Sequence, residues 1–188
     1  MTENSGQPAA NAEPEGTLDY DFPEGLHPDL KGLAWMVGHW EGHGEMTWPG
    51  LGTVKVLEHI DFSHNGQPYL HYLMQAYAEG PDGGLGEPMT MESGFWIPGD
   101  DNEVMVVLTN PEGVAQKWHG TVTALQSAPG RELGTKIEIS TDAVVSQGTH
   151  TAGQRVYGYI NGKMLYAYDR ADNGIDLQSH LSGELERR

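Results

Sequence analysis

The hydrophobic pattern of the chain changes its period at Gly38, and this change restricts the fold more than any other feature. Before it, Leu30, Leu33 and Ala34 recur at helical spacing after a Pro-Asp start signal, which predicts one short helix or 3₁₀ turn. After it, apolar and polar residues alternate with a period of two, as in the run 53–62. The chain is therefore predicted to be all-β beyond a short N-terminal helical turn.

Seven further extended runs follow residue 62, and turn signals rich in Pro, Gly, Asn and Asp separate many of them. The Asn161-Gly162 pair between two runs is a strong hairpin signal. Without helical patterns between the strands, sequential antiparallel pairing is expected, in a closed barrel or a sandwich of about ten strands. Residues 175–188 fit a final strand or a terminal helical turn. The further runs are 69–77, 94–97, 103–109, 115–122, 135–140, 155–160 and 163–168.

Charge and composition divide the chain and exclude several classes of function. Residues 1–25 are acidic and rich in Pro, Gly and Ala, so we expect a disordered tail before a folded domain at 26–188. The formal charge of −17 argues against nucleic-acid partners and anionic membranes. The absence of cysteine excludes disulfides and thiolate chemistry. No secretory signal or membrane segment is evident, which predicts a cytoplasmic protein.

Nine histidines are many for so acidic a chain, but their spacing gives no zinc motif. His39, Glu41 and His43 share one face of a predicted strand, and Trp40 occupies the other. We interpret that histidine face as a polar outer surface. His150 lies in a polar stretch that predicts exposure. A nucleophile elbow of the GxSxG type is absent.

Several modest motifs occur in an order that resembles the nitrobindin family, haem-binding barrels related to fatty-acid-binding proteins. The first is GxWxGxG, with Gly38, Trp40, Gly42 and Gly44. It is followed by SHNGQPYL at 63–70, ESGFW at 92–96, NPEG at 110–113 and TAGQRVYG at 151–158. The last is Ser-His-Leu-Ser at 179–182. The resemblance covers the chain from about residue 27 to the C-terminus and implies a calycin-like, up-and-down β-barrel of ten antiparallel strands.

The resemblance also implies a cofactor and a reaction. His180, in the C-terminal His-Leu pair, corresponds to the axial ligand of one haem b and is the implied catalytic and metal-binding residue. Nitrobindins bind nitric oxide and, in the ferric state, isomerise peroxynitrite to nitrate. Gly50 and Gln154 stand where the family has a Thr and a Lys near the haem, and Arg155 is a candidate propionate contact. Further departures are Ile97, where an Arg is usual, and Glu58-His59, where a pair of Glu is usual.

Two other functions fit the same sequence. A barrel of this class can carry a fatty acid or another small apolar ligand without catalysing a reaction. An acidic interaction domain with a partner-binding tail is the third possibility. Small-molecule ligands are expected in the first two cases, and the oligomeric state, a homodimer included, is left open.

Overall fold

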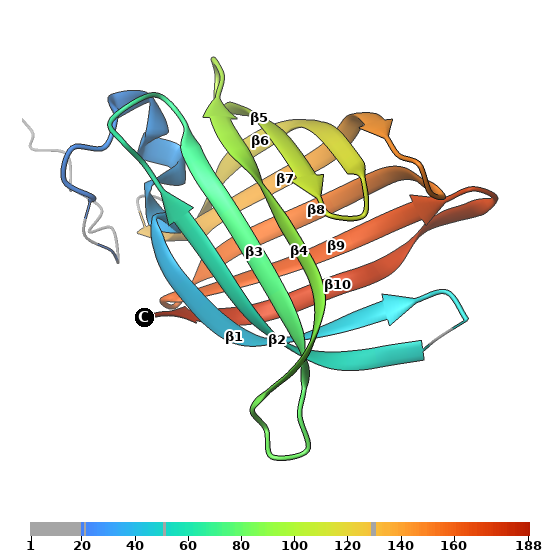
Figure 1. Ribbon diagram of the computed structural model, residues 1–188. Coiled ribbons are helices and arrows are strands. Elements are labelled where there is room, and N and C mark those ends of the chain that lie inside the picture. The colour runs from blue at the N-terminus through green and yellow to red at the C-terminus, as the bar shows by residue number, and fades with distance from the viewer. Residues whose placement is uncertain (1–19, 21, 51, 129–130) are drawn as a thin grey trace, which may run out of the picture.

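The computed structural model describes residues 20, 22–50, 52–128 and 131–188, and it shows a closed barrel of ten antiparallel strands (Figure 1). A 3₁₀ helix, η1 (Pro28–Met36), precedes the barrel. The strands are β1 (Gly38–Trp48), β2 (Gly52–Ser63), β3 (Leu70–Glu79), β4 (Leu85–Pro98), β5 (Glu103–Asn110), β6 (Val114–Ala128), β7 (Arg131–Val145), β8 (His150–Ile160), β9 (Lys163–Asp172) and β10 (Ile175–Arg187).

Each strand pairs with the next along the chain, and β1 pairs with β10 to close the barrel. The predicted all-β fold and up-and-down topology are therefore confirmed. Asn161 and Gly162, both with positive φ (53° and 80°), form the tight turn between β8 and β9 that the sequence predicted. Strands β4, β6 and β7 are longer than expected. Near their ends polar residues occur on both faces, so the alternation of apolar and polar residues that predicts a strand is lost there.

Helix η1 lies across one end of the barrel (Figure 1). Pro28 starts it, and the side chain of His27 accepts a hydrogen bond from the Asp29 amide at its N-terminus. Trp35 is fully buried and contacts Trp40 of β1, whose indole Nε1 donates to the Met36 carbonyl at 2.7 Å. The apolar face of η1 therefore closes this end of the barrel by packing Trp35 against Trp40.

Two features of β1 and β10 shape the opposite end. The ladder between them runs from the Trp40–Arg187 pair to the Met46–Leu181 pair and stops there. In Figure 1 the β1–β2 and β9–β10 hairpins project on this side, away from η1. Residues 175–188, for which a strand and a helical turn were both open, form β10 up to Arg187. The two strands part beyond Met46, so the closing seam of the barrel is incomplete at this end.

The structure describes only part of the predicted N-terminal tail. Residues 1–19 and 21 of the predicted disordered segment 1–25 lie outside the described residues. Tyr20 packs edge-to-face on Tyr159 at 5.7 Å between ring centroids. No helix in the part of the chain that the structure describes has the length and hydropathy to cross a lipid bilayer.

Candidate functional site

A β-bulge in β10 turns His180 into the barrel. Ser179 pairs with Asp169 and Leu181 with Tyr168 on β9, so His180 is an extra residue with no counterpart. Its side chain is 7% exposed although the next residue, Leu181, is also buried. Two consecutive inward side chains break the alternation of a regular strand, and the bulge makes this possible.

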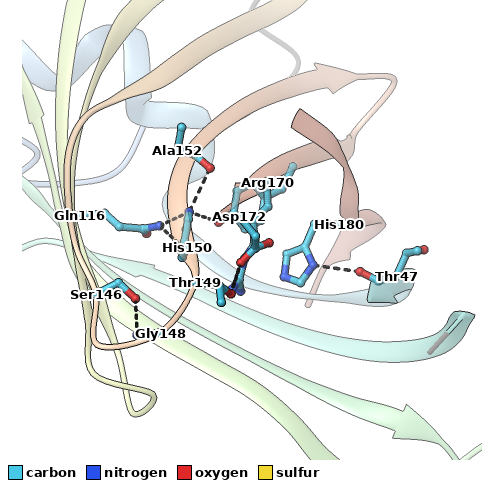
Figure 2. Close-up of polar contacts among 11 residues, drawn as sticks. Thr47, Gln116, Ser146, Gly148, Thr149, His150, Ala152, Arg170, Asp172 and His180 are labelled. Carbon is cyan, nitrogen blue, oxygen red and sulfur yellow. Dashed lines mark hydrogen bonds and ion pairs between the residues drawn. The ribbon is translucent and has the colours of Figure 1, made fainter. Parts of the chain in front are cut away.

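The imidazole of His180 is held in one tautomer and one orientation. Its Nδ1 donates to the Thr47 carbonyl of β1 at 3.0 Å, as Figure 2 shows. Trp48 and Tyr168 contact the ring edge-to-face, with centroids at 4.6 and 5.1 Å. Within the described residues Nε2 makes no hydrogen bond, so its lone pair is free.

The same surroundings keep His180 neutral. Burial lowers the pKa of His180 to about 4, and the hydrogen bond to the Thr47 carbonyl offsets only part of this effect. The positive charges of Arg170 and Arg155 lower the pKa further. At neutral pH the side chain is therefore an uncharged imidazole with one available nitrogen.

Next to the His180 ring lies a largely buried ion pair between Arg170 and Asp172 of β9 (Figure 2). Arg170 Nη2 donates to Asp172 Oδ1 at 2.8 Å, and its guanidinium stacks over Trp48 at 5.3 Å. Thr149 donates to the same carboxylate at 2.6 Å. The pKa of Asp172 is lowered, because these hydrogen bonds and the charge of Arg170 outweigh its burial. The ion pair therefore holds the Arg170 guanidinium beside Trp48, the ring that packs on His180.

A second buried histidine, His150, corrects a sequence-based expectation. The polar stretch around it predicted exposure, but it is 5% exposed at the start of β8. Its Nε2 donates to the Ala152 carbonyl at 3.1 Å, and Gln116 donates to its Nδ1 at 3.2 Å. Its ring lies 6.4 Å from that of Tyr168, which also contacts His180. Sequence reasoning missed it because the residues before it are polar turn residues, and no periodic signal marks where β8 begins.

Arg155 lies deeper in the barrel than a contact at the cofactor edge would require. It is 3% exposed and forms a two-point ion pair with Glu92 of β4, with Nη2–Oε2 at 2.8 Å. Its guanidinium also stacks on Tyr168 at 4.0 Å and on Trp118 at 4.7 Å. Both terminal nitrogens are therefore engaged inside the barrel, and Arg155 reaches His180 only through the Tyr168 ring.

The remaining predicted site residues lie at the surface. Gln154 is exposed between two inward residues of β8, so its side chain is on the outer face of the barrel. Gly50 is exposed in the β1–β2 turn, two residues after Trp48, with φ of +79°. A β-branched Thr at that backbone conformation would be strained, which is a physical reason for glycine here. The structure thus brings Gly50 near the His180 end and turns Gln154 away from the interior.

This arrangement fits one class of cofactor. A single neutral imidazole nitrogen, oriented by a backbone carbonyl and set between aromatic rings, is the protein donor set of haem proteins with one histidine ligand. The carbonyl partner increases the basicity of the free nitrogen. Arg170 provides a cation of the type that pairs with a carboxylate. The residues at this end of the barrel therefore fit haem.

Comparisons with known proteins agree with the geometry. Residues 29–187 match the family described as a THAP4-like, heme-binding beta-barrel domain. A ferric nitrobindin-like protein of Cutibacterium acnes is 38% identical, over 90% of this chain and 99% of its own. A peroxynitrite isomerase of a Nocardioides species is 34% identical, over 91% of this chain and 100% of its own. The crystal structure of Rv2717c from M. tuberculosis superposes with a TM-score of 0.77 at 27% identity, covering 87% and 99% of the two chains.

Proposed function

Because this chain belongs to the THAP4-like haem-binding β-barrel family, we propose that it binds one haem b through Nε2 of His180 and isomerises peroxynitrite to nitrate. The observation that carries the proposal is the buried, neutral imidazole whose Nδ1 is occupied by Thr47 and whose Nε2 is free. Relatives named peroxynitrite isomerase cover most of the chain and support the reaction. When bound, ferric haem supplies a Lewis-acid centre for peroxynitrite and a site for nitric oxide.

The residues of the chain contribute binding, orientation and exclusion of water. His180 provides the one metal ligand, and Thr47 fixes the direction of its ring. Trp48 and Tyr168 form apolar walls that suit a porphyrin plane. Arg170, already stacked on Trp48, is the cation we assign to a propionate, in place of the buried Arg155. Gln154 has no role in this arrangement, since it faces outward.

Titration of the haem-free protein with ferric haem, followed in the Soret band, tests the proposal. We expect saturation at one haem per chain, loss of the histidine-ligated spectrum in His180→Ala, and weaker binding in Arg170→Gln. The matched control is His71→Ala, a partly buried histidine that contacts Phe95 and Ser93 on β4, away from His180. An unchanged spectrum in His180→Ala would overturn the ligand assignment. Absence of any spectral shift in the wild-type protein would favour an apolar-ligand carrier instead.

The reaction is tested separately on the loaded protein. Stopped-flow decay of peroxynitrite should accelerate in proportion to the ferric protein, with nitrate as the product. His180→Ala loaded with excess haem controls for catalysis by free haem. Haem binding without faster decay would leave the cofactor assignment intact and refute the isomerase activity.

A further inference from the structure

A cluster of metal-ligating side chains lies on the outer face of β1 and β2, at the η1 end of the barrel. In the antiparallel register His39 is directly opposite Asp61, and Glu41 is directly opposite His59. Residues directly opposite each other on one face of a sheet have Cβ atoms about 5 Å apart. His39 is eight residues before Thr47 on the same strand, or roughly 27 Å along it. The cluster is therefore separate from the His180 site.

The distances between the ligand atoms of the cluster are close to those around a bound metal ion. His39 Nε2 is 3.1 Å from Glu41 Oε1, and His59 Nδ1 is 3.9 Å from the same oxygen. One ligand atom from each of the three residues lies within 4.8 Å of the others. Zinc–ligand bonds of about 2.0–2.1 Å put two ligand atoms of a tetrahedral ion roughly 3.3 Å apart. A modest change in the His59 rotamer would bring all three to that spacing.

A second contact prepares His39 for this role. Its Nδ1 donates to Asp61 Oδ1 at 2.7 Å, which leaves Nε2 directed at Glu41. Metal-ligating histidines typically donate their other ring nitrogen to a carboxylate in this way. Nε2 of the neutral ring and the Glu41 oxygen are both acceptors, so at 3.1 Å a proton or a metal ion must lie between them.

The surroundings leave room for a cation. Arg188 binds the other carboxylate oxygen of Glu41 at 3.1 Å, so Oε1 remains available. His59 packs edge-to-face on Tyr77, which restricts its ring. Glu41 and His59 also line a surface hollow of about 710 Å³ that would admit a water ligand. The formal charge of −17 attracts metal cations to the surface.

We propose that His39, Glu41 and His59 bind one divalent transition-metal ion of the zinc class, with Asp61 as the hydrogen-bonded partner that orients His39. Two imidazoles and one carboxylate select Zn²⁺ and similar ions over Mg²⁺ and Ca²⁺, which prefer oxygen ligands. The site would hold the ion on three protein ligands and leave one position to water. Zinc binding at this site does not require haem, so its test is independent of the proposed function.

The test is a zinc titration of the tag-free full-length chain at pH 8, in competition with a chromophoric chelator. Hydrogen bonds to Asp61 and Glu41 raise the pKa of His39, and the alkaline buffer removes the competing proton. We expect one Zn²⁺ per chain, confirmed by elemental analysis after dialysis. His39→Ala and His59→Ala should each lower the affinity by at least about 100-fold, and Asp61→Asn by roughly 10–100-fold.

His43→Ala is the matched control, because His43 is exposed on the same face of β1. It should bind zinc as the wild-type chain does, and a tenfold excess of Mg²⁺ should not compete. Circular dichroism of each variant checks that the barrel is folded. Stoichiometric binding that is unaffected by His39→Ala and His59→Ala would overturn the proposal. So would equal losses in His43→Ala, effective competition by Mg²⁺, or no binding by the wild-type chain.

Discussion

The side chain of His180 completes the β1–β10 ladder at Thr47. The last backbone pair of that ladder is Met46 with Leu181, and the next carbonyl, that of Thr47, accepts its hydrogen bond from His180 Nδ1 at 3.0 Å. The bulge that produces this contact leaves Nε2 without a hydrogen bond within the described residues. One irregularity in β10 therefore ends the closing seam of the barrel and orients the histidine that we propose as the metal ligand.

We predict that Arg155 and Glu92 act mainly on stability, as a pair. The pair is buried and Glu92 also accepts from Tyr72 at 2.9 Å, so the pKa of Glu92 is lowered although burial alone would raise it. Arg155→Leu leaves a buried carboxylate without its cation and should reduce the free energy of unfolding by about 3–5 kcal/mol. Urea denaturation measures the change. The double variant Arg155→Leu/Glu92→Gln should recover much of the loss, because the Gln amide oxygen still accepts from Tyr72.

The exposed ion pair between Lys117 and Asp142 serves as the comparison. Its Nζ–Oδ2 distance is 3.1 Å, but both side chains are about half exposed, so Lys117→Ala should change stability little. A double variant no more stable than Arg155→Leu alone would show that the two residues do not act as a pair.

Glu58 makes stability fall as the pH rises. Burial raises the pKa of Glu58 to about 8, against a smaller effect of the hydrogen bond from Tyr166. Between pH 4.5 and 8 the native chain therefore holds a proton on Glu58 that the unfolded chain has lost, and the contribution of Glu58 to stability declines by up to about 1.4 kcal/mol per pH unit. Glu58→Gln should remove this decline, as measured by denaturation from pH 5 to 8. The exposed Glu45→Gln is the control, and an identical slope in Glu58→Gln would refute the assignment.

Gly44 of the GxWxGxG motif provides space for that carboxyl group. A Cβ atom on Gly44 would lie 2.0 Å from Glu58 Oε1 and 2.2 Å from the Ser182 carbonyl of β10. Because the second clash is with backbone, Gly44→Ala should destabilise the barrel by at least about 1–3 kcal/mol in thermal unfolding. The control is Gly158→Ala in β8, where the added Cβ would lie 4.0 Å from the Leu165 and Thr135 carbonyl oxygens and the substitution should be neutral or slightly stabilising. Equal unfolding temperatures of the two variants would contradict this explanation.

Much of the fold was predictable because barrel strands carry a local signal. The period-two pattern in 53–62 placed Val56 and Ile60 in the core, and it marked Glu58 as an exception on the buried face. Asn161-Gly162 predicted its turn because Asn and Gly readily adopt the positive φ at both positions that one common type of two-residue hairpin requires. The form of residues 175–188 was not predictable, since the bulge at His180 interrupts the alternation of β10.

The site was predictable only in part. His180 was proposed from the resemblance of its surroundings to a family motif, whereas its contacts with Thr47 and Trp48 depend on where the β1–β10 ladder ends. Arg155 and Gln154 are adjacent in sequence, and the strand turns one inward and the other outward. His150 is buried because it packs against Gln116 and Tyr168. These residues are distant in sequence, so the local sequence around His150 does not indicate its burial.

His180 should make the haem-free protein sensitive to acid. Its pKa of about 4 in the native state lies below the ordinary value of 6.5, because burial disfavours the charged ring. Between these pH values the unfolded chain binds a proton that the native chain does not, so the contribution of His180 to stability is complete above pH 6.5 and is lost as the pH falls to 4. The total is about 3 kcal/mol at most. His150, whose pKa burial also lowers, acts in the same direction.

The measurement is urea denaturation of haem-free wild-type protein and His180→Phe at several pH values from 4 to 7. Phenylalanine keeps an aromatic ring against Trp48 and Tyr168 but cannot take a proton. It should be less stable than the wild type at pH 7, because it leaves the Thr47 carbonyl without its donor. The difference should shrink or reverse by pH 4, since only the wild type loses the contribution of this histidine. A difference independent of pH would show that His180 takes up its proton as readily in the folded protein as in the unfolded chain.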